Sequence, residues 1–134
     1  MVKLLKIVAF LFLILLIWTF SGSGAKPVTA DLVAAEAARR VSFPADLGDG
    51  FRLDSISASG NTVVSTVTLL TEPGGVADPA LQQVLDTASR SDICRELAGS
   101  KDVYVKANLR LAKRYLNSAG GEIVMVTVDP ASCP

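Results

Sequence analysis

An apolar segment close to the N-terminus limits how much of this chain can fold as a globular domain. Residues 7–20 are almost all apolar, and they follow Lys3 and Lys6 and precede the small residues 21–25. A basic start, an apolar stretch and small residues, in that order, are typical of an export signal. We therefore expect the rest of the chain to lie outside the cytosol.

The same segment is compatible with cleavage or with retention as a membrane anchor. Ser23 and Ala25 are the small residues of a cleavage site. A helix of residues 7–20 spans about 21 Å, short of the roughly 30 Å hydrocarbon core, but the flanking residues close that gap. We predict a signal peptide or N-terminal hydrophobic helix at 1–25 and one disulfide-stapled α+β domain at 26–134. This domain is periplasmic or secreted after cleavage, and otherwise anchored to the inner membrane and facing outward.

The charge balance argues against a polyanionic partner. The chain has 13 basic and 13 acidic residues, and two of the basic residues, Lys3 and Lys6, lie in the leader, which leaves 11 against 13. Nucleic-acid binding normally needs a concentrated positive surface. We therefore expect no nucleic acid among the partners.

Two cysteines, Cys94 and Cys133, fall in the exported part of the chain. In an oxidising compartment an even number of cysteines indicates a disulfide first. The alternative is a pair of redox-active thiols, but such pairs are usually spaced as Cys-x-x-Cys, which is absent here. A metal site is a poorer interpretation, because two thiols without histidine supply too few soft ligands.

No residue pattern in the chain predicts a catalytic site. Histidine, the commonest general base near neutral pH, is absent. Ser23 and Lys26 have the spacing of a Ser-Lys pair but lie at the leader boundary. Asp46, Asp49 and Asp54 could suggest a calcium loop, yet they do not match the ligand spacing of an EF-hand, and Asp and Gly are ordinary turn residues. We assign no catalytic residue, metal ligand or cofactor and predict that the protein is not an enzyme.

Local signals predict an α-β-β-α-β-β order. Thr29 is suited to cap a first helix, Gly60-Asn61 to turn a hairpin, and Asp78-Pro79 to begin a second helix. The predicted elements are a helix at 30–42, a turn-rich connection at 45–50, strands at 51–58 and 62–70, a helix from 79 with a break at 89–91 and a second segment ending at 99, and strands at 103–111 and 122–128. We expect an α+β, two-layer domain in which a four-stranded antiparallel sheet carries helices on one face.

The third predicted strand carries the most concentrated charge. Apolar residues at 103–111 alternate with Tyr104, Lys106 and Arg110, the pattern of a strand with one buried face. The pattern does not fix the residue at which this strand ends, because residues 109–116 could also form a helical turn. If the strand continues, its outer face carries Tyr104, Lys106, Arg110 and Arg114, with Lys101 and Lys113 nearby.

This basic face has two interpretations. It can be the solvated side of the sheet, or it can contact an acidic protein partner or anionic lipid headgroups. In the second case Tyr104 would anchor the interface. A free sheet edge is the other place where we expect a partner to bind.

The last third of the chain resembles a class of small exported bacterial proteins, most of them uncharacterised. The matching residues are Cys94, Gly99, Tyr115, Gly120, Gly121, Val126, Val128 and Cys133. The helix–hairpin–helix–hairpin order is also similar to that of small type II secretion pilotins. The resemblance implies a binding accessory rather than an enzyme. Those pilotins are lipoproteins, whereas this chain has no cysteine just after its apolar segment to receive a lipid.

Together these features predict a non-enzymatic module that binds a protein partner or assists assembly in the cell envelope. It would touch the membrane through its N-terminal segment if that segment is retained. An inhibitor or immunity protein of a secreted enzyme is a second interpretation, and an enzyme of unrecognised type is a third.

Overall fold

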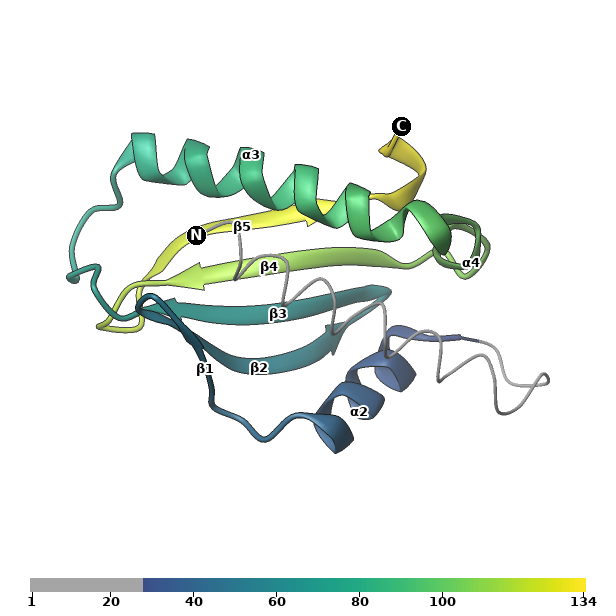
Figure 1. The fold of residues 1–134 in the computed structure, drawn as a ribbon, viewed down its shortest axis with the longest axis horizontal. Coiled ribbons are helices and arrows are strands. Elements are labelled where there is room, and N and C mark those ends of the chain that lie inside the picture. Colours follow the sequence, from purple (N-terminus) through teal and green to yellow (C-terminus); the bar gives the residue numbers. More distant parts are fainter. Residues whose placement is uncertain (1–27) are drawn as a thin grey trace.

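The computed structural model describes residues 28–134, which form an α+β fold (Figure 1). The predicted leader at residues 1–25, its cleavage at Ala25 and the Ser23–Lys26 spacing lie outside the described residues. Within the part that the structure describes, no helix is both long and apolar enough to cross a membrane.

The secondary structure of the described chain contains five strands, which form one sheet. The elements are α2 (Ala30–Arg40), β1 (Ala45–Gly48), β2 (Phe51–Ser59), β3 (Thr62–Leu69), α3 (Pro79–Glu96), a 3-10 turn (Leu97–Gly99), α4 (Lys101–Lys106), β4 (Arg110–Leu116), β5 (Glu122–Val128) and a second 3-10 turn (Pro130–Ser132).

The predictions for α2 and for the β2–β3 hairpin are confirmed. The Thr29 hydroxyl accepts a hydrogen bond from the backbone N–H of Leu32 at 3.2 Å, which satisfies a free donor of the first turn. The buried face of α2 is small and apolar, so the helix can lie close to β2. That face consists of Ala30, Val33, Ala34 and Ala37.

The sheet has the order β1-β2-β3-β4-β5, and β3 pairs with β4 in parallel. The predicted four-stranded antiparallel sheet is therefore wrong, although the other neighbouring strands are antiparallel. The physical reason is α3, whose 18 residues span about 27 Å and return the chain to the end of the sheet where β3 begins. Strand β4 then starts beside β3 and runs in the same direction (Figure 1).

The fifth strand, β1, lies in the segment predicted to be only a turn. Ala45 pairs with Leu53 and Asp46 with Arg52, so β1 extends the hairpin at its outer edge. Only four residues long, it has too few alternating positions to carry a strand pattern.

Helix α3 begins as predicted, with the Asp78 carboxylate accepting a hydrogen bond from Ala80 N–H at 3.0 Å. The predicted break at residues 89–91 is wrong, because α3 continues to Glu96. Its buried face contains two polar residues, Ser89 and Asp92. The apolar pattern changes phase because these polar side chains occupy positions that face the sheet.

The predicted strand at residues 103–111 is also wrong. Its first half is α4, and Asn108, with a φ of 55°, ends the turn that follows. The alternation of small apolar side chains with Tyr104 and Lys106 fits a short helix as well, because Tyr104 is the one fully buried residue of α4 and Val103, one position before it, packs partly buried against the core. Residues 110–116, which could have been strand or helical turn, form β4.

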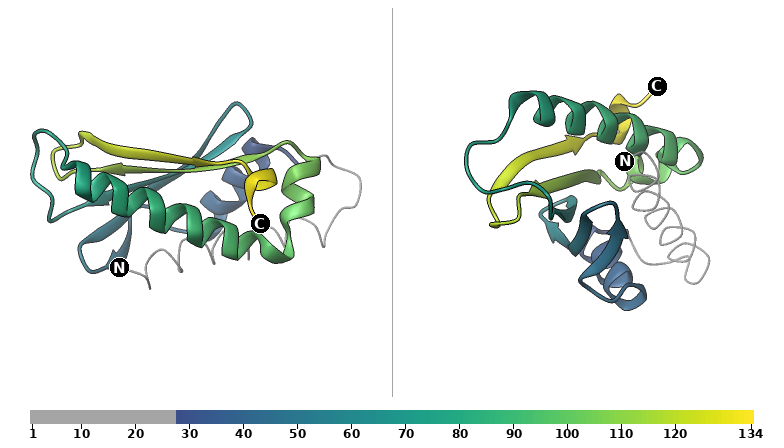
Figure 2. Two further views of the ribbon diagram at one scale, coloured as in Figure 1. Left: turned by 90° about the horizontal axis from the view of Figure 1, so that it is seen from above. Right: turned by 60° about the vertical axis from the view of Figure 1, so that its left-hand side comes forward.

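The core lies between the sheet and the helices. Helix α2 packs on β2 and β3, toward one edge of the sheet, and α3 packs on β5, at the other edge. Both helices cover the same face (Figure 2). Along β2 to β5 the core-facing residues are buried, whereas Ser57, Arg114 and Met125 on the opposite face are exposed. The two-layer arrangement with helices on one face is therefore as expected.

Candidate functional site

The structure does not bring the four predicted contact residues together on one strand face. Tyr104 lies on α4 and is fully buried, so it cannot anchor a surface contact. Lys106 is exposed at the end of α4, and Arg110 and Arg114 are exposed on β4. The shared strand face is wrong because residues 101–106 are helical, and a helix turns Tyr104 and Lys106 to different sides.

The three basic side chains remain candidates for partner contact. Arg110 and Arg114 are four residues apart on β4 and share the exposed face of the sheet. The Nε of Arg114 lies 2.9 Å from Oε1 of Glu122, so part of its charge is already balanced. A contact role for Lys106, Arg110 and Arg114 stays a prediction.

One of the two sheet edges is occupied by side chains of α3. Gln82 Nε2 donates to the carbonyl oxygen of Ile123 at 2.7 Å, and Arg90 Nη1 donates to that of Thr127 at 3.0 Å. Both carbonyls belong to the edge strand β5. Because an added strand would need such backbone groups, α3 protects this edge and leaves the short strand β1 as the other edge.

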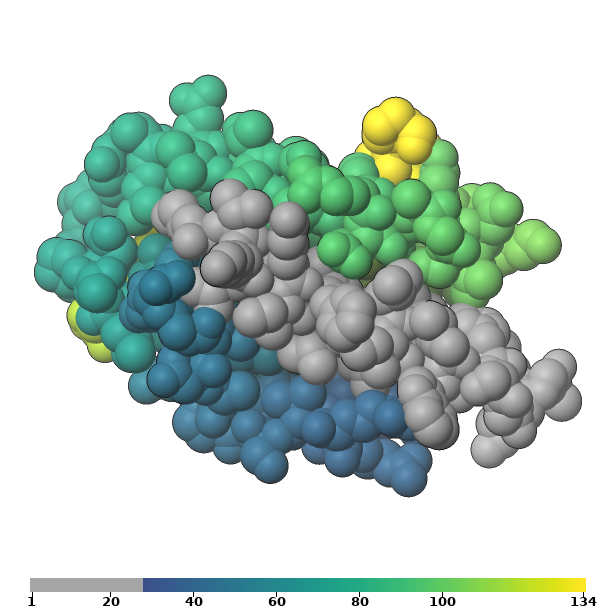
Figure 3. Space-filling view, in the orientation of Figure 1, coloured from purple at the N-terminus to yellow at the C-terminus, as the bar shows by residue number. Residues whose placement is uncertain are grey.

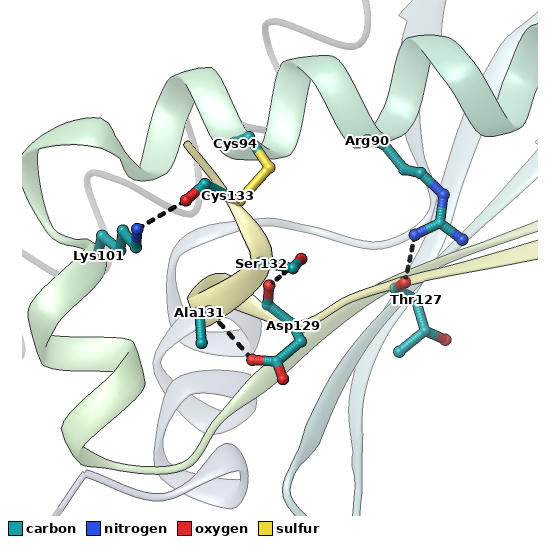
Figure 4. Close-up of a disulfide and its surroundings, with 8 residues drawn as sticks. All are labelled: Arg90, Cys94, Lys101, Thr127, Asp129, Ala131, Ser132 and Cys133. Atoms are coloured by element: carbon teal, nitrogen blue, oxygen red, sulfur yellow. Dashed lines mark hydrogen bonds between the residues drawn. A yellow bond between two sulfur atoms is a disulfide. The ribbon is translucent and has the colours of Figure 1, made fainter.

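The disulfide between Cys94 and Cys133 joins α3 to the C-terminal tail, as predicted (Figure 4). Its Cα atoms are 5.3 Å apart, a usual separation for a disulfide. The Lys101 ammonium donates to the Cys133 carbonyl at 2.7 Å, and the Asp129 carboxylate accepts from Ala131 N–H at 3.1 Å. The tail therefore lies against the end of α3. In the space-filling view its last residues stand out from the surface beside this helix (Figure 3).

A buried polar cluster between α3 and the sheet was not predicted from the sequence. Lys113, on β4, faces the helices and is 1% exposed, and its register partner on β3 is the fully buried Ser65. Neither the Lys113 amine nor the Ser65 hydroxyl has a hydrogen-bond partner. Buried polar groups are nearly always bonded, and an amine that can carry a charge is especially costly to bury without a partner.

The acidic residues nearest to this amine come from α3. Burial lowers the pKa of Lys113 to about 8, and the carboxylates of Asp92 and Glu96 raise it by less than burial lowers it. Asp92 is itself buried and ion-paired with Arg95, with Nη1 and Oδ1 3.3 Å apart. The Lys113 amine thus has a pKa near neutral pH and forms no direct ion pair.

A hydrogen bond one turn earlier on α3 also links the helix to β4. The hydroxyls of Ser89 and Tyr115 are 2.7 Å apart and both residues are buried. Burial raises the pKa of Tyr115 to about 12, with a smaller lowering effect from the Ser89 hydrogen bond and a raising effect from Asp92. Burial likewise raises the pKa of Tyr104, well above its usual range.

Replacing Tyr115 with phenylalanine should lower the free energy of unfolding by about 1 kcal/mol, because the Ser89 hydroxyl is left buried and unpaired. Ser89→Ala should cost a similar amount, and the double variant little more than either one. Urea unfolding of the four proteins measures this coupling. Losses that simply add would show that the two hydroxyls do not act as a pair.

One further cavity and the carboxylate of Asp54 are accounted for by structural contacts. A cavity formed by the loop before α3 and the β4–β5 turn includes Asp78, which caps α3, and Asn117, whose side chain accepts from Ala119 and Gly121 N–H. Asp54 binds Arg52 at 2.6 Å and also accepts from the Thr68 hydroxyl. Among residues 28–134 no three Cys, Asp or Glu side chains are grouped so as to hold a metal ion.

Two solved structures of bacterial proteins have a similar fold. The chain is 28% identical to the pilotin EpsS of the Vibrio vulnificus type 2 secretion system, with a TM-score of 0.57 over 78% of this chain and 92% of that chain. A secreted protein of Pseudomonas aeruginosa aligns with a TM-score of 0.56 and 11% identity, over 84% of this chain and 100% of that one. No protein-family model matches the sequence, and neither does any curated protein sequence. The chain is thus distantly similar to type II secretion pilotins.

Proposed function

We propose that this protein is a non-enzymatic accessory of the bacterial cell envelope that acts by binding another protein. The observation that carries the proposal is its likeness to the pilotin EpsS, which extends over most of both chains. By that likeness, its partner is a component of an envelope secretion system. The disulfide supports an oxidising compartment, and the absence of histidine removes the commonest general base.

The chain would reach the membrane differently from a lipoprotein. Its only two cysteines, Cys94 and Cys133, are joined to each other, so neither is free to carry a lipid. We propose that residues 7–20, if retained, take the place of the lipid and hold the domain on the outer side of the inner membrane. Cleavage after Ala25 would instead release it.

The exposed cations Lys106 and Arg110 form the proposed contact. Lys106 ends α4 and Arg110 begins β4, so both lie at the end of the sheet where β4 starts (Figure 1). Neither forms an ion pair in the described structure. Charges of this kind guide an acidic partner during encounter.

Replacing both Lys106 and Arg110 with glutamate should reduce capture of the partner from native envelopes about tenfold, because two attractive contacts become repulsive. The measurement is crosslinking and affinity capture with the full chain, read by quantitative mass spectrometry. The matched control is Arg39→Glu with Arg40→Glu, which makes the same charge change at the end of α2.

The identity of the captured protein tests the function, and the variants test the surface. A secretion-system component as the main captured species supports the proposal, whereas a secreted hydrolase or toxin would replace it with the inhibitor function. If the control loses as much capture as the Lys106 and Arg110 variant, the effect is one of net charge and the proposed surface is wrong.

A further inference from the structure

Lys113 is enclosed by two strands and a helix. It lies in the middle of β4, with Ser65 of β3 on one side and Val126 of β5 on the other. The charged groups that face it are Asp92 and Glu96, both from α3. Neither carboxylate is within ion-pair distance of the amine, and Asp92 is instead paired with Arg95.

The attachments of α3 to the rest of the fold lie around this amine rather than on it. Gln82 and Arg90 bond to the edge strand β5, Ser89 bonds to Tyr115, and Cys94 is joined to the tail. The turn of α3 that carries Asp92 and Glu96 thus lies near the Lys113 amine without forming a hydrogen bond or an ion pair with it. Movement of α3 away from the sheet would let water reach a protonated amine, which hydration favours over burial without a partner.

We propose that α3 is a pH-responsive cover over Lys113, which separates from the sheet more often when the amine is protonated and closes more firmly when the amine is neutral. Protonation of the buried Lys113 amine would thus control a local opening of the fold. It does not rest on the proposed envelope function.

The direction of the pH effect follows from the pKa of Lys113. Burial lowers this pKa from 10.5 to about 8 in the closed state, and an opened, hydrated amine regains the higher value. Between these two values the open state binds more protons, so the closed state gains stability as the pH rises. Going from about pH 6.5 to about pH 9 should therefore reduce the open population of α3 about tenfold.

Amide hydrogen–deuterium exchange of the full chain, read by mass spectrometry, measures this opening. Peptides from α3 are compared with peptides from α2 at about pH 6.5 and about pH 9, after correction for the intrinsic pH dependence of exchange. The test variant is Lys113→Met, which keeps much of the volume without the charge. The control is Arg114→Met, which removes a neighbouring charge from the exposed face of β4.

We expect the protection of α3 relative to α2 to rise about tenfold with pH in the wild type and in Arg114→Met, and to stay constant in Lys113→Met. A rise that persists in Lys113→Met would overturn the proposal, as would equal changes in α2 and α3. Because the comparison of the two helices is made within the wild type, an unchanged wild-type α3 refutes the proposal even if a variant does not fold.

Discussion

Replacing Cys94 and Cys133 with alanine should lower the free energy of unfolding by about 4 kcal/mol. The disulfide closes a segment of 39 residues that contains the end of α3, α4, β4 and β5. Without it, the unfolded chain gains conformational freedom that the folded state does not. Urea unfolding of the oxidised wild type and of the variant measures the difference.

A reductant provides the control for this prediction. It should lower the stability of the wild type to that of the alanine variant and leave the variant unchanged. The tail retains other attachments, including the hydrogen bond from Lys101 to the Cys133 carbonyl. A loss below about 1 kcal/mol would mean that these contacts hold the tail and that the loop-closure account in terms of chain entropy is wrong here.

The elements that could be predicted from the sequence are those with signals inside a short segment. Thr29 and Asp78 mark the helix starts with side chains that accept backbone hydrogen bonds, and the Gly60 turn leads into a strand rich in β-branched residues. Such interactions are formed between residues a few positions apart. The pairing of Cys94 with Cys133 followed from the even cysteine count, the expected oxidising compartment and the absence of Cys-x-x-Cys spacing.

The parallel β3–β4 pair and strand β1 depend instead on contacts between distant residues. Val63 meets Leu111 only because α3 returns the chain across the sheet, and no residue in either strand encodes that direction. The alternation of apolar and polar residues at 103–111 predicts a strand, yet residues 101–106 form α4, in which Tyr104 is buried in the core.

The buried amine was missed because the strand boundary was misplaced. With β4 at Arg110–Leu116, Lys113 falls between Leu111 and Tyr115 on the inward face, a position where lysine is rare. A strand beginning at residue 103 and ending at 111 leaves Lys113 outside the strand. The alternation of Leu111, Lys113 and Tyr115 therefore indicates a buried lysine, but only once the strand is known to run from Arg110 to Leu116.

Replacing Lys113 with methionine should raise the free energy of unfolding at about pH 7 by about 3 kcal/mol. At that pH the amine is charged in both states, but the folded state holds the charge out of water without a direct partner. Methionine fills similar space and removes this cost. Urea unfolding at several pH values gives both the gain and its pH dependence.

The pH dependence separates this explanation from a general packing effect. Because burial lowers the pKa of Lys113 to about 8, the wild type should gain stability from about pH 8 to about pH 10.5, and the variant should not. The two proteins should therefore approach equal stability at high pH. Arg114→Met, on the exposed face of the same strand, should change stability by less than about 1 kcal/mol at every pH. If Lys113→Met is instead destabilised near neutral pH, the amine forms a stabilising interaction in the folded protein, and the buried charge is not a cost.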